Sequence, residues 1–474
     1  MIIIKFGGTS VGDAQRVANA IDIVAERQKL EPIVVVSALA GVTNDLVAAT
    51  EAARACDMER VNQIIGAIRQ RHEDVAMRLV QQKFDFFESF IKQLDKQIEQ
   101  IHTILRGIAL LGEITMRAKD KVVAIGEKLS SVLFAYSMMM RAVPGEHVDS
   151  EDVIITDSRF GEANPQMDET RAAARRVLLP LVERNRIPVM GGFIGRTADG
   201  ATTTLGRGGS DYSAAIVGAA VGADEIQIWT DVDGMMTCDP RLVPAARVIE
   251  RISYVEAAEL AWFGAKVLHP RTIAPAVAAG ISVRVLNTHN VASSGTLITE
   301  EGDALKTGPR AVAVKRGITV VHMTSNTMLG AHGFLARLFA LFEELEISVD
   351  LITTSEVSVS VTIDEKHNLE RLVEKLRPVA DVEVRDNQCI VAIVGRNLMN
   401  DSIVGARVFE AIRGVPISMF SLGTSGLNLS IVAEDADADR AVKAIHAALF
   451  EGQGKDVIRS VARELGVQGR RPRS

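Results

Sequence analysis

The sequence predicts an α/β domain built on a parallel sheet, followed by two copies of a smaller α/β module. Two observations lead to this prediction. Candidate strands alternate with candidate helices as far as about residue 290, and the rest of the 474-residue chain contains an internal repeat. A chain of this length is expected to hold two or three domains, so both observations fit its size.

The first elements indicate the type of sheet. Residues 2–5 form an apolar run that predicts a buried strand, and Gly7 and Gly8 predict the turn after it. Residues 14–29 carry Val17, Ile21 and Val24 at helical spacing, and residues 33–37 form a second β-branched run. The order strand, helix, strand predicts a parallel pair, because parallel neighbours need a crossover connection.

The following segments continue the alternation. Residues 57–119 are almost free of proline and periodic in Ile, Leu and Val, which predicts a helical insert over the sheet. Further strands are predicted at residues 188–190, 226–230 and 283–286. We therefore expect one large α/β domain up to about residue 290.

A constant offset of 70 residues relates two parts of the C-terminal region. The recurring residues are Arg337 and Arg407, Phe339 and Phe409, Ile347 and Ile417, Ser348 and Ser418, Thr354 and Thr424, Ser355 and Ser425, and Ser360 and Ser430. Each copy has the pattern strand, helix, short strand, alternating strand, helix, strand. The repeat predicts two tandem copies of one module.

Composition limits the classes of function. The formal net charge is −7, so the overall field does not favour nucleic acid, and an anionic ligand must rely on local cations and helix N-termini. The three cysteines, Cys56, Cys238 and Cys389, form no CxxC pair, which argues against a disulfide framework or structural zinc. No apolar run reaches the roughly 18 residues of a membrane helix, and no charged leader precedes the first strand. We expect a cytosolic protein without membrane or nucleic-acid partners.

Two glycine-rich loops have the composition of a phosphate site. They are residues 5–10, KFGGTS, and residues 202–211, TTTLGRGGSD. Each combines unhindered backbone N–H groups, hydroxyls and one cation, Lys5 or Arg207, which suits a polyanion. Neither loop matches GxxxxGK[ST] or GxGxxG. The alternatives are an ordinary turn with a solvated Lys5, and an N-cap role for Ser210 or Asp211.

Six motifs, in this order, resemble the aspartate kinases of the amino-acid-kinase superfamily. They are KFGGTSV at 5–11, GFIG at 192–195, TTLGRGGSDYSAA at 203–215, WTDVDG at 229–234, DPR at 239–241 and FGAKVLHPRT at 263–272. The repeat resembles the paired ACT modules of that family, which are ferredoxin-like α+β units that bind amino-acid effectors. The resemblance implies an amino-acid-kinase domain at 1–300, a first ACT module at 318–388, a second made of 306–317 and 389–455, and a tail at 456–474.

The resemblance implies transfer of the γ-phosphoryl group of ATP to the β-carboxylate of L-aspartate, the first step toward lysine, threonine and methionine. It implies catalytic roles for Lys5, Gly8, Gly209, Ser210 and Asp211, and substrate contacts from Ser37, Thr43, Glu127, Phe193, Arg207 and Ser210. The residues matching ATP-binding positions are Lys5, Gly7, Gly8, Thr9, Ser10, Thr230, Asp231, Met236, Arg241, Lys266 and Val267. Mg²⁺ is expected to be carried by ATP, with no direct protein ligand assigned, and Asp211 would organise the catalytic loop through Mg²⁺ or through Lys5.

Three residues need separate comment. Met236 stands where relatives often carry Tyr, so an aromatic contact with the nucleotide is lost there. Taken alone, Glu127 is interpreted as a solvated carboxylate at a helix start, an interpretation that the surrounding family motifs reverse. His269 is interpreted as a buried, hydrogen-bonded histidine and not as a catalyst.

The first repeat copy resembles the effector site of lysine-sensitive aspartate kinases. The residues implied are Met328, Gly333, Phe334, Leu335, Ser348, Val349, Asp350, Ser355 and Glu356. Asp350 and Glu356 offer two carboxylates to a dicationic amino acid, whereas the second copy has Phe420 and Gly426 there. We expect feedback inhibition by L-lysine, with L-threonine as the alternative effector. Ala331 replaces an expected serine, a change that could weaken effector binding.

Other functions fit parts of the pattern. The modules are also expected to join copies of the chain into a homodimer or larger assembly, and pairing of this kind is the alternative to effector binding. Within the superfamily, a kinase acting on glutamate, carbamate or UMP is the alternative enzyme, although the tandem modules argue against it. A non-catalytic amino-acid sensor with the same fold is the alternative from another class.

Overall fold

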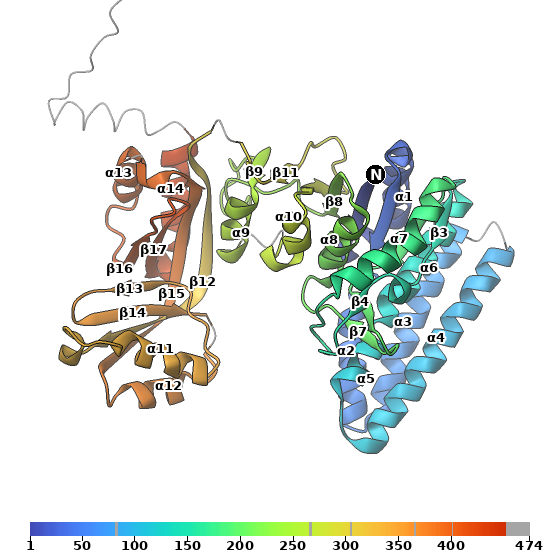
Figure 1. The fold of residues 1–474 in the computed structure, drawn as a ribbon, viewed down its shortest axis with the longest axis horizontal. Coiled ribbons are helices and arrows are strands. Elements are labelled where there is room, and N and C mark those ends of the chain that lie inside the picture. The colour runs from blue at the N-terminus through green and yellow to red at the C-terminus, as the bar shows by residue number, and fades with distance from the viewer. Residues whose placement is uncertain (81–83, 265–267, 304–305, 365, 401, 452–474) are drawn as a thin grey trace, which may run out of the picture. The chain divides into compact units, whose positions relative to one another are not determined.

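A computed structural model describes residues 1–451 except 81–83, 265–267, 304–305, 365 and 401 (Figure 1). The chain divides into two compact units. The first contains Met1–Met235, Glu250–Tyr254 and Val267–Gly302, and the second contains Met236–Ile249, Val255–Lys266 and the chain from Asp303 onward. The second unit therefore takes in two segments that lie within residues 1–300 of the sequence.

An eight-stranded sheet forms the centre of the first unit, in the order β3-β5-β2-β1-β8-β10-β11-β9. The six strands from β3 to β10 in this order run parallel, and β11 is antiparallel to β10. The strands are β1 (Ile2–Phe6), β2 (Pro32–Val36), β3 (Gly145–His147), β5 (Ile187–Gly191), β8 (Glu225–Thr230), β9 (Arg251–Ser253), β10 (Ser282–Asn287) and β11 (Thr296–Thr299). A second sheet contains β4 (Ile155–Thr156), β6 (Ile194–Thr197) and β7 (Thr202–Thr204).

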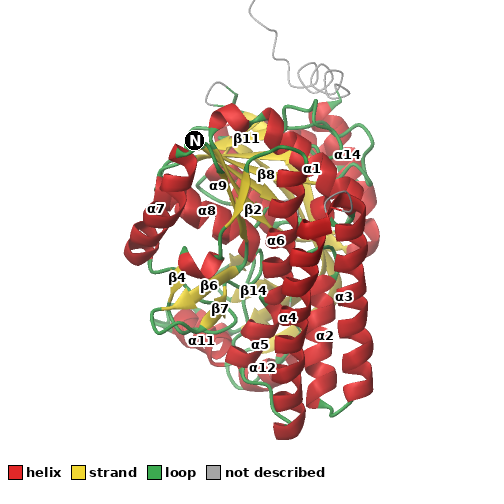
Figure 2. Ribbon diagram, turned by 90° about the vertical axis from the view of Figure 1, so that its right-hand side faces the viewer, coloured by secondary structure: helices red, strands yellow, loops and turns green. Residues whose placement is uncertain are grey.

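The alternation of side chains along β1 determines what each face of the sheet contacts. Ile2, Ile4 and Phe6 are buried in a core formed largely by helices α1 to α4 and α6. Ile3 and Lys5 point to the opposite face, where Gly218 of α8 lies against Ile3. Figure 2 shows α7 and α8 on one side of this sheet and α1 and α6 on the other. The helices are α1 (Ala14–Glu26), α2 (Val42–Arg54), α3 (Met58–Val80), α4 (Phe84–Leu111), α5 (Met116–Val123), α6 (Ile125–Met140), α7 (Met167–Glu183), α8 (Gly209–Val221) and α10 (Ala274–Ala278).

The first long helix begins at Ala14, where the sequence predicted it. We also expected this helix to present its N-terminus to an anion bound at the Gly-Gly turn. A 3₁₀ turn, η1 (Gly8–Val11), separates Gly7 from the helix. Asp13 caps α1, because its side chain accepts a hydrogen bond from the backbone N–H of Arg16 at 2.9 Å. The N-terminus of α1 therefore already has its own carboxylate.

One helical stretch, Met116–Met140, is long and apolar enough to cross a membrane, contrary to the expectation that no run would be. It comprises α5 and α6, and 83% of its most apolar part is buried inside the protein. Burial of this kind is typical of helices in the core of a globular domain.

The second unit is built on a six-stranded antiparallel sheet in the order β13-β14-β12-β15-β17-β16. Its strands are β12 (Gly308–Thr324), β13 (Ile352–Thr354), β14 (Ser358–Ile363), β15 (Asp381–Arg396), β16 (Ile417–Leu422) and β17 (Asn428–Glu434). Its helices are α9 (Tyr254–Trp262, of which Tyr254 belongs to the first unit), α11 (Phe334–Glu344), α12 (Leu369–Leu376), α13 (Ser402–Ala411) and α14 (Ala438–Phe450).

The two repeat copies have separate hydrophobic cores. One core contains side chains of α11 and α12, and the other contains side chains of α13 and α14. The long strands β12 and β15 run through both copies, and their register shifts between Lys315 and Ile318. Gly317 lies in this shift with a φ of 70°. The predicted fold class is confirmed, whereas the predicted module boundaries stay a prediction.

A buried ion pair holds α9 to β12. Arg310 Nε lies 3.3 Å from Glu256 Oε1, and the two side chains are 7% and 0% exposed. Arg310 Nη2 also donates to the carbonyl oxygens of Asp303 and Lys306, at 3.0 and 2.6 Å. A single substitution at either position therefore removes one of the partners of a buried charge.

We expect Arg310→Met to lower the free energy of unfolding of the second unit by about 3–5 kcal/mol, because Glu256 keeps its charge without this partner. The double variant Arg310→Met/Glu256→Leu should recover most of that loss, since it removes both charges. Urea unfolding, followed by circular dichroism, measures the free energy of unfolding of the single and the double variant. A double variant no more stable than Arg310→Met would contradict this account.

Candidate active site

A pocket of about 400 Å³ lies where neighbouring parallel strands end. Strands β1, β2 and β5 run parallel, so their carboxyl ends share one edge of the sheet, the usual ligand position in open α/β sheets. The expected residues that line the pocket are Lys5, Gly8, Ser37, Thr43, Glu127, Phe193, Arg207, Gly209, Ser210 and Asp211. The structure thus brings together all the residues expected to be catalytic or to contact the substrate.

Lys5 places a buried positive charge in this pocket. It lies on the face of β1 that is turned toward α8, and Asp211 lies in the first turn of α8. Lys5 Nζ is 2.5 Å from Asp211 Oδ1, and Lys5 is only 7% exposed. A Cβ atom on Gly8 would lie 3.1 Å from the carbonyl oxygen of Ala38, so the turn after β1 packs tightly against the loop after β2. Lys5 is therefore not an ordinary solvated turn lysine.

Glu127 is a buried carboxyl group in the wall of the pocket. It lies in the first turn of α6 and is 4% exposed, so its interpretation as a solvated carboxylate is wrong. Burial raises the pKa of Glu127 to about 8, and backbone N–H groups of Ala38 and Glu127 offset only part of this effect. Among the described residues, its Oε2 atom has no hydrogen-bond partner. A cationic ligand group in the pocket would satisfy it.

The loop before α8 leaves the helix N-terminus open. Gly208, with a φ of 68°, is the N-cap residue, and no side chain caps the helix. The interpretation of Ser210 or Asp211 as the N-cap is therefore wrong, because both lie within the first turn. Arg207 is exposed and lines the pocket beside this turn. An uncapped helix N-terminus next to a guanidinium suits an anion, although Gly209 N already donates to the carbonyl oxygen of Gly206 at 3.0 Å.

Glycines allow the turn after β5 to approach α8. A Cβ atom on Gly209 would lie 2.5 Å from Phe193 Cδ2, and one on Gly192 would lie 2.6 Å from Ser210 Cβ. Phe193 itself has a φ of 67°, and its backbone N–H donates to Ser213 Oγ at 2.8 Å. The glycines in both motifs are thus required by close packing as well as by any ligand.

The residues expected to bind ATP are only partly brought together. Gly7 and Ser10 contact the end of β8, since Gly7 N donates to the carbonyl oxygen of Trp229 at 3.2 Å and Ser10 Oγ donates to the same oxygen at 3.3 Å. Thr9 lies in η1, and Thr230 and Asp231 follow Trp229 directly. Of these residues, none lines the pocket, and their roles stay predictions.

The remaining ATP residues lie elsewhere in the chain. Met236 and Arg241 belong to the second unit. Arg241 is 88% exposed and its guanidinium pairs with Asp239 at 2.6 Å. Lys266 and Val267 lie outside the described residues. ATP contacts from these four residues also stay predictions.

Asp120 is a residue near the pocket that the sequence did not point to. It is 1% exposed on α5, and its carboxylate accepts hydrogen bonds from Gly161 N, Thr204 N and Thr204 Oγ1 at 2.8–2.9 Å. Burial raises the pKa of Asp120, and these hydrogen bonds oppose the rise. It therefore fixes the end of β7.

The interpretation of His269 as a buried, hydrogen-bonded histidine is wrong about its burial. The residue is exposed, although its Nδ1 atom does accept a hydrogen bond from Arg271 N at 3.3 Å.

Asp350, the first carboxylate of the expected effector site, already has a cationic partner. Its side chain is 1% exposed, and Lys315 Nζ lies 2.8 Å from its Oδ1 atom and 2.9 Å from Asp364 Oδ2. The same ammonium lies 5.1 Å from the ring centre of Trp262. Burial raises the pKa of Asp350, and Lys315 opposes this. No pattern in the sequence pointed to Lys315.

The other expected effector residues divide by exposure. Phe334 is buried in the α11 core, and Met328 and Val349 pack against that core. Gly333 has a φ of 73° and is the N-cap of α11, which no side chain caps. The members of the set that lie in contact with solvent are Leu335, Ser348, Ser355 and Glu356. Their roles stay predictions.

Comparisons with known proteins cover almost the whole chain. Residues 1–287 match the model of the amino acid kinase family, and residues 321–372 and 391–449 match that of the ACT domain. The chain is 37% identical over 467 residues to lysine-sensitive aspartokinase 3 of Escherichia coli, which covers 95% of this chain and 99% of that protein. It is 36% identical over 464 residues to chloroplastic aspartokinase 3 of Arabidopsis thaliana, covering 95% of this chain and 81% of that one.

Solved structures agree with these relatives. E. coli aspartokinase III in complex with aspartate and ADP, in the R-state, matches with a TM-score of 0.81 and 36% identity over 95% of this chain and 100% of that chain. The same enzyme in complex with lysine and aspartate, in the T-state, matches with a TM-score of 0.79 and 36% identity over 95% and 99%. The chain belongs to the aspartokinase family and is an aspartate kinase.

Proposed function

We propose that this enzyme transfers the γ-phosphoryl group of ATP to the β-carboxylate of L-aspartate, giving 4-phospho-L-aspartate and ADP. The observation that carries this proposal is a single pocket that contains two cations, Lys5 and Arg207, and a buried carboxyl group, Glu127. These groups complement the carboxylates and the ammonium of aspartate. The substrate carboxyl group has a solution pKa near 4, so it is ionised at pH 7 and needs no strong general base.

The difficulty of the reaction is repulsion between anions. A β-carboxylate oxygen attacks the γ-phosphorus, the bond to the β,γ-bridging oxygen breaks, and ADP leaves with the electron pair. Lys5 and the backbone N–H group of Gly8 would stabilise the charge on the phosphates, while Asp211 holds the Lys5 ammonium in place. Gly209 N would join them by leaving the carbonyl oxygen of Gly206, to which it donates at 3.0 Å. Mg²⁺ bound with the ATP phosphates would add positive charge there.

Aspartate would bind through its charges. Arg207 would clamp one carboxylate, and the ammonium would donate to the unpartnered Oε2 atom of Glu127. Since the pKa of Glu127 is about 8 without ligand, the bound ammonium must displace a proton at neutral pH. Ser37, Thr43 and the Phe193 backbone would line the substrate.

We further propose that L-lysine inhibits the enzyme at the first ACT module. Two observations support this: the E. coli relative is named lysine-sensitive, and Asp350 and Glu356 supply two carboxylates there. In this chain the effector cation would have to displace Lys315 from Asp350. L-threonine remains the alternative effector.

We also propose a homodimer or larger assembly through the ACT modules. The edge strands β13 and β16 support this, because Ile352, Ile417 and Phe420 are 47%, 40% and 38% exposed on them. Unpaired edge strands with apolar side chains are open to pairing with another copy.

We expect Lys5→Met to lower kcat about 10²–10³-fold, because it removes a preorganised cation from the phosphates. ADP release with MgATP and L-aspartate measures the rate. The matched control is Lys29→Met, an exposed lysine on the same unit, which should keep the wild-type rate. A Lys5→Met enzyme with near wild-type kcat would contradict the assignment.

We expect Glu127→Gln to raise KM for aspartate and to remove its pH dependence. In the wild type, KM for aspartate should fall as pH rises toward 8, since the pKa of Glu127 is about 8 and only the carboxylate attracts the ammonium. KM measured from pH 6 to 9 tests this. A flat wild-type profile would contradict the role of Glu127.

The same variant should be more stable than the wild type at high pH. Folding raises the pKa of Glu127 from its ordinary value of 4.5 to about 8, so the stability that the protonated group provides below pH 4.5 is lost as pH rises to about 8. The loss is about 1.4 kcal/mol for each pH unit between the two pKa values. The melting temperature of Glu127→Gln should therefore exceed that of the wild type by more at pH 9 than at pH 5.

We expect Asp350→Ala to raise the lysine concentration for half-inhibition at least tenfold, and Lys315→Met to lower it. The first removes the carboxylate, and the second removes the ammonium that competes for it. Lys366→Met, from the exposed pair with Asp386, is the control. Inhibition by threonine alone, or lysine inhibition unchanged in Asp350→Ala, would show that the proposed effector site is wrong.

A further inference from the structure

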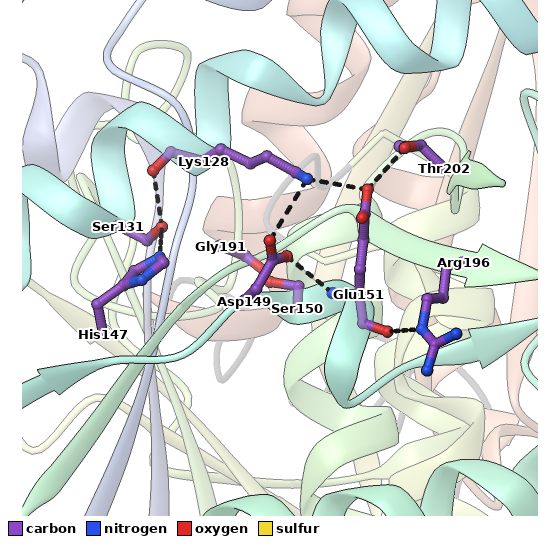
Figure 3. A network of polar contacts seen from close by, with 9 residues as sticks. All are labelled: Lys128, Ser131, His147, Asp149, Ser150, Glu151, Gly191, Arg196 and Thr202. Carbon is purple, nitrogen blue, oxygen red and sulfur yellow. Dashed lines mark hydrogen bonds and ion pairs between the residues drawn. The ribbon is translucent and has the colours of Figure 1, made fainter. Parts of the chain in front are cut away.

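A polar network close to the pocket joins α6, the 3₁₀ turn η3 (Ser150–Asp152) and β7 (Figure 3). Lys128 Nζ on α6 lies 2.9 Å from Glu151 Oε1, and Thr202 Oγ1 at the start of β7 donates to the same oxygen at 2.6 Å. Asp149 Oδ2 is 3.5 Å from Lys128 Nζ. We refer to Lys128, Asp149, Glu151 and Thr202 as the Glu151 network. These four residues are not among those that line the pocket.

The backbone that carries Glu151 is fixed on several sides. Asp149 Oδ1 accepts a hydrogen bond from the backbone N–H of Glu151 at 3.0 Å. Ser150 Oγ donates to the carbonyl oxygen of Gly191, the last residue of β5, at 2.5 Å. Arg196 Nε on β6 donates to the carbonyl oxygen of Glu151. The Glu151 side chain therefore extends from an anchored base.

The central ion pair is largely shielded from water. The side chains of Lys128 and Glu151 are 22% and 20% exposed, in contrast to many surface pairs of this chain. Solvent screens exposed ion pairs, so they contribute little to stability, and partial burial reduces that screening. A hydrogen bond from Thr202 to the same carboxylate makes the contact directional as well. Glu151 can therefore hold α6 and β7 at a defined separation.

Each end of the network adjoins a residue proposed to bind aspartate. Lys128 directly follows Glu127 on α6. Thr202 begins β7, which leads within five residues to Arg207, and Asp120 fixes the other end of this strand through Thr204. Glu127 would bind the ammonium of aspartate and Arg207 one of its carboxylates, and these two groups are separated by only a few bonds in the substrate. The distance between α6, which carries Glu127, and the loop after β7, which carries Arg207, therefore matters for aspartate binding.

We propose that Glu151 is a positioning residue for L-aspartate, which holds Glu127 and Arg207 at the separation that the substrate requires. This inference rests on the proposed roles of those two residues. Misplacement of reacting groups by about 1 Å can cost 10²-fold in rate, so a contact behind the pocket is sufficient. The residues expected to bind the phosphates, Lys5 and Gly8, lie outside the network. Glu151 should therefore affect aspartate binding more than ATP binding.

The test compares KM for aspartate with KM for ATP in Glu151→Ala, Glu151→Gln and Thr202→Val. We expect Glu151→Ala to raise KM for aspartate at least tenfold and to leave KM for ATP within twofold. Glu151→Gln should lie between Ala and the wild type, because its amide oxygen still accepts from Thr202. Thr202→Val should also raise KM for aspartate, by a smaller factor than Glu151→Ala.

A matched control is the ion pair of Glu146, on β3, with Arg186 at 3.0 Å. Glu146→Gln should leave KM for aspartate and KM for ATP at the wild-type level. A double variant, Lys128→Met/Glu151→Gln, should raise KM for aspartate no more than the larger single change, because both residues act through one contact.

Two results separate the inference from the proposed function. Equal increases in both KM values, or a lower melting temperature with unchanged KM for aspartate, would overturn the positioning role of Glu151. The proposed function would survive that result if Glu127→Gln still raised KM for aspartate. If Glu127→Gln leaves KM for aspartate unchanged, the assignment of Glu127 fails, and the inference fails with it.

Discussion

The ion pair between Lys5 and Asp211 is the contact on which the active site depends. Two anionic substrates must meet in a protein whose net charge is −7, so the attraction has to come from local cations. Asp211 Oδ1 lies 2.5 Å from Lys5 Nζ as its counterion. The alternation along β1 directs Lys5 to the face of the sheet that α8 covers, and Asp211 lies in the first turn of α8. The surrounding glycines then let backbone N–H groups reach the same space.

Glu127 illustrates the cost of such a site. A buried carboxyl group whose pKa rises to about 8 lowers the stability of the folded chain as pH rises from 4.5 to about 8, and its Oε2 atom lacks a partner in the described structure. The large core around α6 compensates for this elsewhere. The ammonium of bound aspartate would donate to the Oε2 atom of Glu127 and supply the missing hydrogen bond. Substrate binding would therefore stabilise the folded chain. This explains why a destabilising residue sits in an otherwise well-packed wall.

The sequence predicted what local pattern determines. The parallel start of the sheet follows from the strand, helix, strand order, and the tandem modules follow from the 70-residue offset. Residues of both glycine-rich loops line the same pocket, and their roles there stay predictions. The sequence could not predict contacts that depend on distant segments, such as Asp120 with Thr204, which are 84 residues apart, or Lys315 with Asp350. In the sequence alone, a single charged residue in a helix or strand gives no sign of whether its side chain is buried or solvated.

Lys315 joins features that the sequence treats separately. Its ammonium contacts Asp350 of the expected effector site, Asp364 after β14 and the ring of Trp262 at the end of α9. α9 also depends on the buried pair of Glu256 with Arg310, and it immediately precedes residues 263–272, the motif matched to ATP binding. An effector that takes Asp350 must leave Lys315 with fewer partners, which changes the contacts that hold the end of α9. A ligand can shift an equilibrium only by binding two states differently, and competition for one carboxylate provides such a difference within a single unit.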